Sequence, residues 1–142
     1  MAKSLRPTPS PKPAKAEWRR ASGGTSRGAG RRAEWIAAIW LMLHGWQILG
    51  FRLKSRAGEI DILARRGKVL AVVEVKRRPT LEAAMAAIGA EQHARLLAAG
   101  RAVLRGRPSL AGHQLRIDMV ALAPGRFPRH LSAISPPGDG FP

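Results

Sequence analysis

Short apolar segments follow one another through the middle of the chain, at Trp46–Leu53, Ile60–Ala64 and Val69–Lys76. Their content of Ile, Leu and Val is typical of β-strands, and Gly58 and the run Arg66-Gly67-Lys68 separate them as turns do. The pattern therefore predicts three strands in a meander.

Helical patterns flank this meander on both sides. Residues 31–44 are strong helix formers and almost continuously apolar, and Gly45 follows as a typical C-cap. A helix that is apolar around most of its surface is expected to be buried on most sides. A second helix is predicted from about Ala90 to Arg105, preceded by a short helical turn, with strands at Gln114–Leu122 and His130–Ile134. The order αβββαββ predicts a fold of the α/β (α+β) class, with a mixed central β-sheet flanked by helices.

The two ends of the chain have a different composition from its middle. Residues 1–30 are basic and rich in Pro, Gly and Ser, so they predict a disordered tail with little apolar surface to offset the entropy of ordering it. An organellar transit peptide is the alternative interpretation of such an Arg-rich start. Residues 31–134 are expected to form a single domain, and residues 135–142 a frayed C-terminus.

The charge of the chain favours a polyanionic partner. The 142 residues hold 25 Lys and Arg against nine Asp and Glu, a formal net charge of +16, and an excess of this size most often indicates nucleic acid. The absence of cysteine excludes disulfide scaffolds, thiolate zinc sites and thiol nucleophiles. The longest wholly apolar run, Trp35–Leu43, has nine residues against the roughly 20 of a spanning helix, so we expect no integral membrane protein.

Two acids fall on strand positions that an antiparallel hairpin would bring together. Strand alternation places Asp61 on one face of its strand, and Glu74 and Lys76 together on one face of the next. Pairing through a turn at residues 65–68 sets Asp61 opposite Glu74. Neighbouring carboxylates repel, and a divalent ion such as Mg²⁺ or Mn²⁺ relieves that repulsion. Lys76 could then orient a water and steady the charge that builds on a phosphate.

Each of these residues also has a plainer interpretation. Glu34 shares an apolar helix face with Ala37, Ala38 and Leu41, where it could supply a further acid, or it could be a first-turn glutamate favoured by the helix dipole. Glu74 and Lys76 could form a solvated pair. Glu59 or Asp61 could pair with arginines at positions 56 or 65.

The combination of segments resembles a known family. Glu34 in the first helix, Gly45–Arg66 with its Gly58-Glu59-Ile60-Asp61 run, Val69–Arg78 with Glu74-Val75-Lys76, and Leu115–Leu122 are together similar to the YraN-like family of bacterial proteins. The resemblance covers about residues 31–123. That family resembles archaeal Holliday-junction resolvases, with a restriction-endonuclease-like fold and a PD-(D/E)xK site. The resemblance implies that Asp61 and Glu74 bind the metal, that Lys76 is the catalytic lysine and that Glu34 is the helix acid.

The function expected from this resemblance is a cytoplasmic, Mg²⁺- or Mn²⁺-dependent DNA endonuclease or structure-selective nuclease, whose substrate could be branched DNA and which is compatible with a homodimer. Basic side chains would grip phosphates, namely Arg52, Lys54, Arg56, Arg77 and Arg78. The family usually carries a lysine in a Lys-Gln context in the second helix, where this chain reads Glu91-Gln92-His93. That departure favours the alternative of a non-catalytic module that binds DNA or structured RNA. A subunit that docks on an acidic protein is the third interpretation.

The remaining polar and aromatic residues give weaker signals. The four histidines, His44, His93, His113 and His130, lack ligand spacing, and no glycine motif implies a nucleotide cofactor. Asp118 and Arg116 are expected to form a structural ion pair. The tryptophans of the apolar runs, Trp35, Trp40 and Trp46, are expected in the core.

Overall fold

The computed structural model describes residues 30–135. The predicted tail, apart from Gly30, and the predicted frayed end from residue 136 lie outside the described residues. Residues 30–32 belong to a different unit of the chain from residues 33–142, and the account below concerns the second unit.

The predicted elements are present, with boundaries that differ by at most three residues. Residues 30–43 are helical. The elements that follow are β2 (Gln47–Lys54), β3 (Glu59–Arg66), β4 (Val69–Arg77), α2 (Leu81–Met85), α3 (Ala90–Gly106), a 3₁₀ turn (Pro108–Leu110), β5 (Gln114–Leu122) and β6 (Arg129–Leu131).

Within the described residues the strands form one five-stranded mixed sheet in the order β2-β3-β4-β5-β6. The first three strands are the predicted antiparallel meander. β5 then pairs parallel to β4, which requires the chain to cross over through α2 and α3, and β6 returns antiparallel as an edge strand. The mixed α/β class and the flanked central sheet are thus confirmed, as expected for a restriction-endonuclease-like fold.

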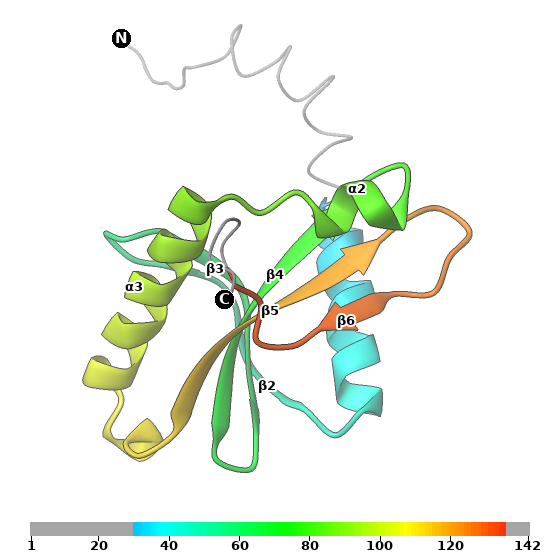
Figure 1. Ribbon diagram of the computed structural model, residues 1–142. Helices are drawn as coiled ribbons and strands as arrows, with labels where there is room; N and C mark the ends of the chain where they lie inside the picture. Colours follow the sequence, from blue (N-terminus) through cyan, green and yellow to red (C-terminus); the bar gives the residue numbers. More distant parts are fainter. Residues whose placement is uncertain (1–29, 136–142) are drawn as a thin grey trace, which may run out of the picture. The chain divides into compact units, whose positions relative to one another are not determined.

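Helices cover both faces of this sheet (Figure 1). α2 and α3 pack on one face, where Leu81 and Leu96 join the sheet residues Leu63, Val72 and Ile117 in a buried cluster. The helix of residues 30–43 packs on the other face through three alanines, Ala33, Ala37 and Ala38, and through Leu41. Side-chain alternation along the strands thus creates two apolar layers.

α3 lies very close to the sheet because Gly100 faces it. A Cβ atom at position 100 would lie 2.8 Å from Leu115 Cδ1 and 2.9 Å from Val72 Cγ2, closer than real Cβ contacts. A side chain there would push the helix outward. This close approach fixes the height of α3 above β4 and β5.

Two predictions about burial were wrong. The helix of residues 30–43 is not buried on most sides, because Trp35 is 57% exposed and Leu43 74% exposed in the chain. Trp46 is buried as expected, whereas Trp35 is exposed and Trp40 is only half-buried, so neither of these two belongs to the core. Ile60 packs in the same cluster as Leu63, although regular alternation along β3 would put the two side chains on opposite faces. At that end β3 no longer pairs with β4, since the ladder begins at Ile62 and Val73, and the preceding Gly58 lies against α3 at Arg95.

Among the described residues, no helix combines the length and the apolar character that crossing a membrane requires.

Candidate active site

The register of the hairpin between β3 and β4 is the one that the sequence predicts. Ile62 pairs with Val73, Leu63 with Val72 and Ala64 with Ala71. The pairing ends there, and Asp61 and Glu74, the next residue of each strand, interact through their side chains. Both side chains lie on the face covered by α3, at the end of the hairpin away from the turn.

Asp61 and Glu74 form a partly buried acid pair. Glu74 is 6% exposed, and Asp61 Oδ2 accepts a hydrogen bond of 2.9 Å from the Val75 N–H. Burial raises the pKa of Asp61, and repulsion from the Glu74 carboxylate raises it further, so that the pKa reaches about 7 despite the Val75 N–H and Lys76. The pair therefore holds more negative charge than its surroundings neutralise at neutral pH.

Glu74 is fixed by two donors from different elements. Lys76 Nζ lies 3.2 Å from Glu74 Oε2, and the lysine side chain is only 15% exposed. Gln92 of α3 donates from Nε2 to the same oxygen at 2.8 Å. Both donors meet Oε2, and the Glu74 carboxyl also interacts with the Asp61 side chain.

A cavity of about 220 Å³ opens beside the acid pair. Its lining comes from the β2–β3 loop, the two strands and α3, namely Gly58, Glu59, Asp61, Glu74, Gln92, Arg95 and Leu96. The sequence interpretation did not single out Gln92 or Arg95 as site residues. A signal for Gln92 was present, because it precedes the buried Leu96 and Ala99 at helical spacing and so belongs to the inner stripe of α3.

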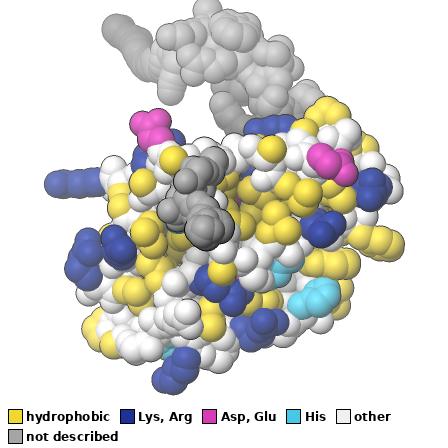
Figure 2. Space-filling model, in the orientation of Figure 1, with side chains coloured by type: hydrophobic (Ala, Val, Ile, Leu, Met, Phe, Trp, Pro, Cys, Tyr) yellow, Lys and Arg dark blue, Asp and Glu magenta, His cyan; other side chains and the backbone are white. Residues whose placement is uncertain are grey.

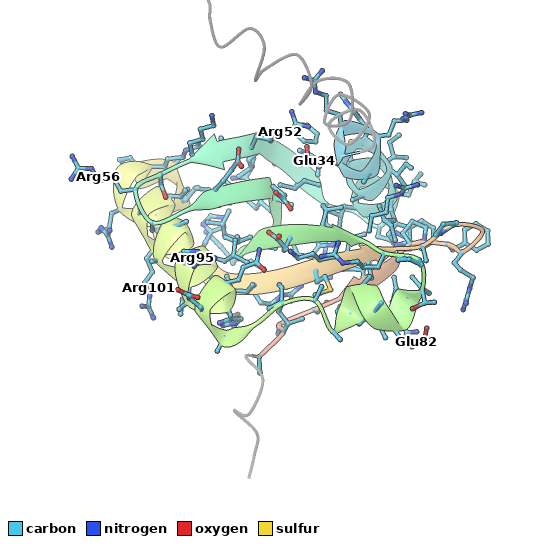
Figure 3. All side chains as sticks on the ribbon, turned by 90° about the horizontal axis from the view of Figure 1, so that it is seen from above. Glu34, Arg52, Arg56, Glu82, Arg95 and Arg101 are labelled. Atoms are coloured by element: carbon cyan, nitrogen blue, oxygen red, sulfur yellow. The ribbon has the colours of Figure 1, made fainter. Side chains whose placement is uncertain are left out.

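Glu34 lies apart from the acid pair in an ion pair of its own. Arg52 Nη2 lies 2.8 Å from Glu34 Oε1, and Figure 3 shows the two side chains pointing toward one another from the helix and from β2. Burial raises the pKa of Glu34, with Asp61 and Glu59 adding to the rise and Arg52 opposing it. The negative charge of Asp61 therefore repels the Glu34 carboxylate, but the structure does not bring Glu34 into contact with Asp61 and Glu74. Arg52 adopts φ 50°, a left-handed conformation uncommon outside glycine.

The donors at the acid pair suit a hard divalent cation. Carboxylate oxygens are the ligands that Mg²⁺ and Mn²⁺ prefer, together with several waters. The cavity of about 220 Å³ has room for such a hydrated ion, since each water occupies about 30 Å³. Residues 30–135 contain no group of three or more His, Asp or Glu side chains close enough to hold a metal ion. An ion at this site would therefore take protein ligands from Asp61 and Glu74 and complete its coordination with water or substrate oxygens.

The five basic residues predicted to contact phosphate are all exposed, namely Arg52, Lys54, Arg56, Arg77 and Arg78. Arg56 projects from the β2–β3 loop away from the Glu34–Arg52 pair (Figure 3). Arg77 is the last residue of β4 and Arg78 follows it, and the antiparallel pairing of β3 with β4 places this end of β4 at the same end of the sheet as the β2–β3 loop. On the face seen in Figure 2, basic side chains are spread among apolar ones and acidic side chains are sparse.

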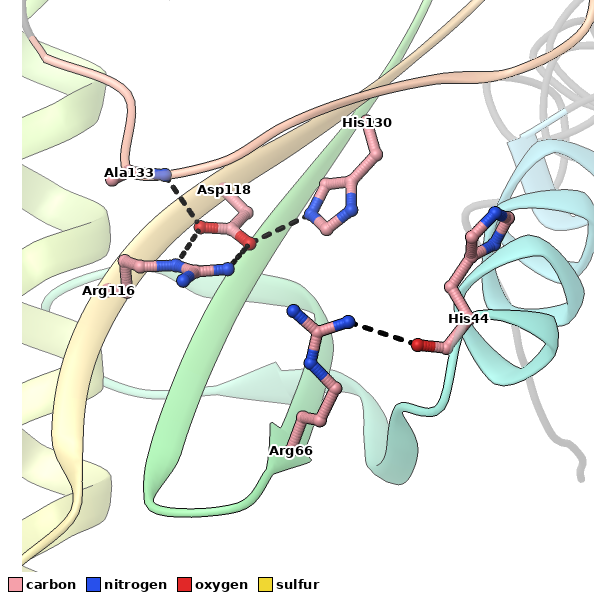
Figure 4. A network of polar contacts seen from close by, with 6 residues as sticks. All are labelled: His44, Arg66, Arg116, Asp118, His130 and Ala133. Carbon is pink, nitrogen blue, oxygen red and sulfur yellow. Dashed lines mark hydrogen bonds and ion pairs between the residues drawn. The ribbon is translucent and has the colours of Figure 1, made fainter.

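A second buried acid, Asp118, has a complete set of partners (Figure 4). Arg116 donates to both of its carboxylate oxygens, at 2.9 and 2.8 Å, which confirms the expected ion pair. His130 Nε2 lies 2.8 Å from Oδ2, and the Ala133 N–H donates to Oδ1 at 2.9 Å. Burial raises the pKa of Asp118, but the bonds from His130, Arg116 and Ala133 outweigh it and lower the pKa to about 2. This network is a closed structural unit.

The fold and the site together define a mixed α/β protein with a carboxylate pair and a lysine where two central strands leave the core. Residues 33–122 match the family described as "Uncharacterised protein family UPF0102", and the chain belongs to that family. It is 52% identical over 120 residues to the UPF0102 protein of Caulobacter sp. (strain K31), covering 84% of this chain and 86% of that one. It is 53% identical over 113 residues to the protein of the same description from Caulobacter vibrioides (strain NA1000 / CB15N), covering 80% and 90%. A third relative is from Maricaulis maris, at 44% identity over 110 residues, covering 78% and 87%.

Proposed function

We propose that this protein is a metal-dependent endonuclease that hydrolyses phosphodiester bonds of DNA, linear or branched, in the bacterial cytoplasm. One observation carries the proposal: Asp61 and Glu74, one residue beyond the last paired residues of β3 and β4, interact through their side chains, and Lys76 Nζ lies 3.2 Å from Glu74. The net charge of +16 supports a polyanionic substrate.

Each residue has a stated task in this proposal. Asp61 and Glu74 would hold Mg²⁺ or Mn²⁺, which when bound supplies Lewis-acid polarisation of the phosphate and lowers the pKa of an attacking water. Lys76 would orient that water and stabilise the charge that grows on the phosphate oxygens. Gln92 would keep Glu74 in position, because it donates a hydrogen bond to Oε2. Arg95, at the rim of the cavity, would contact a phosphate.

The test is cleavage of linear and branched DNA with Mg²⁺ or Mn²⁺ by the full chain and three variants. We expect Asp61→Asn and Lys76→Met each to lower the cleavage rate at least about 100-fold, as expected when a metal ligand or a group that stabilises transition-state charge is lost. Lys68→Met is the matched control, because Lys68 is exposed in the β3–β4 turn and away from the cavity. Equal cleavage by all four proteins would show that the activity does not come from this site.

A non-catalytic nucleic-acid-binding module is the second candidate, favoured by the engagement of Glu34 with Arg52 instead of the acid pair. Such a module would bind DNA with a steep salt dependence but would cut none. Calorimetric titration with Mn²⁺ separates the two, since only the nuclease proposal requires binding that Glu74→Gln abolishes.

A further inference from the structure

We propose that the exposed side of the helix of residues 30–43, together with Phe127, is the surface on which a second copy of this chain docks. This apolar face comprises Trp35, Ile36, Ile39, Met42, Leu43 and Phe127, which are between 47% and 81% exposed. Phe127 belongs to it because its ring lies 6.1 Å from that of Trp40, stacked across the gap between the β5–β6 loop and the helix.

The spacing of the apolar face is that of a packing surface. Positions 35, 36, 39, 42 and 43 follow the helical repeat of three and four residues, so they form one continuous stripe. The opposite stripe of the same helix, with Ala37, Ala38 and Leu41 at 0% exposure, already packs on the sheet. The helix is therefore apolar on two sides, and residues 30–135 cover only one of them.

The size of the apolar face matches what a stable dimer needs. Six large side chains at this exposure present roughly 800 Å² of apolar surface, given that a large aromatic alone buries 150–250 Å². Monomers seldom expose more than about 300–600 Å² in one patch, and a standard interface buries about 800 Å² on each partner.

The chemistry of the chain selects a second copy as the occupant. Residues 35–43 carry no charge, so the helical part of the face brings no like charges of the two chains together. The exposed Arg126 and Arg129 flank Phe127 at the edge of the face. The segments outside the described residues offer only Met1, Leu5, Trp18 and Phe141 as large apolar side chains, fewer than the face needs. A second copy supplies the same six residues.

Two-fold symmetry then fixes the contacts. In an isologous interface the residue at the centre meets itself and the flanking residues exchange partners. Ile39 is the centre of the stripe, so it would lie beside Ile39 of the partner subunit, and Trp35 would pack over Leu43 of the partner subunit. The cavity beside Asp61 and Glu74 lies on the other face of the sheet and stays open, so this proposal is independent of the proposed function.

The test uses the full chain in analytical ultracentrifugation and in cysteine cross-linking. We expect a dimer at micromolar concentration and a dissociation constant raised at least about 100-fold by Ile39→Glu, which buries two unpaired charges on the symmetry axis. Ala98→Glu is the matched control, because position 98 is exposed on α3 outside the face. Circular dichroism melting verifies that both variants fold.

Cysteine cross-linking tests the same contact at position 39 without introducing a charge that could destabilise the protein. The chain has no cysteine, so Ile39→Cys introduces one thiol, and mild oxidation should join two chains through it while Ala98→Cys stays largely uncoupled. A monomeric wild type at 100 μM overturns the proposal. So does a dimer that Ile39→Glu leaves intact, or binding of the wild type through this face to anionic phospholipid vesicles without dimer formation.

Discussion

Two buried aspartates on the same sheet have opposite electrostatic outcomes. Asp118 on β5 is 0% exposed and has a pKa lowered to about 2, whereas the less buried Asp61 on β3 has a pKa raised to about 7. Burial raises the pKa of both. The difference lies in the partners, because Asp118 receives four hydrogen bonds from three residues, while Asp61 receives one N–H and faces a second carboxylate.

The comparison separates a structural acid from a functional one. A buried carboxylate with all its bonds made lowers the free energy of the folded state and leaves no oxygen for a ligand. A carboxylate pair with too few donors raises that free energy and is relieved by a cation or a proton. Poor compensation, more than depth of burial, therefore marks the site in this sheet.

The largest change in stability should come from removing the Asp118 carboxylate, which has a complete set of hydrogen-bond donors. We expect Asp118→Ala to lower the free energy of unfolding by about 3–5 kcal/mol, because Arg116 and the Ala133 N–H lose their shared acceptor inside the protein. Urea unfolding at pH 7 measures this. A loss below about 1 kcal/mol would show that the network contributes little to stability.

Replacing Asp61, which has too few hydrogen-bond donors, is expected to raise the free energy of unfolding instead of lowering it. The pKa of Asp61 is about 7 in the folded state and about 3.9 in the unfolded state, so between these values the folded state binds the extra proton. The free energy of unfolding of the wild type therefore falls as the pH rises from about 4 to 7. Asn at position 61 carries no such charge, so Asp61→Asn should raise the free energy of unfolding by about 2 kcal/mol at pH 8 without divalent ions, and by much less at pH 5.

Urea unfolding at both pH values in EDTA tests this sign. The control is Glu82→Gln, an exposed acid on α2 whose replacement should change stability little at either pH. An Asp61→Asn protein that is less stable than the wild type at pH 8 would contradict the interpretation of the acid pair as strained.

The smallest effect should come from the half-exposed ion pair of Glu34 and Arg52. The arginine side chain is 40% exposed, so water screens the attraction, and Arg52→Gln should lower the free energy of unfolding by less than about 1 kcal/mol. Raising the NaCl concentration should shrink this loss further, whereas the loss in Asp118→Ala should be nearly insensitive to salt. If the losses of unfolding free energy in the two variants depended equally on salt, the exposed pair and the buried network would not differ in how strongly water and ions screen them.

Much of the acid pair could be predicted because it depends on local rules. Strand alternation and a short turn determine which residues of a hairpin face one another, so the positions of Asp61, Glu74 and Lys76 followed from their spacing. The ion pair of Arg116 and Asp118 followed for the same reason, since it spans two residues of one strand.

The partners that come from other elements could not be predicted in the same way. Gln92 reaches Glu74 from α3, Arg52 reaches Glu34 from β2, and Ala133 reaches Asp118 through a left-handed backbone at φ 52°. These contacts depend on the height and rotation at which each helix or loop docks. Close packing, as at Gly100 beneath α3, decides those values.

The order of residues by itself determined the strands, the register of the β3–β4 hairpin and which acids share a face, because side chains alternate every two residues wherever the strands are paired. Only the tertiary structure decided which acid is compensated and which side of the first helix stays uncovered. Both depend on what other segments bring to a given point in space, and a periodic pattern carries no record of that.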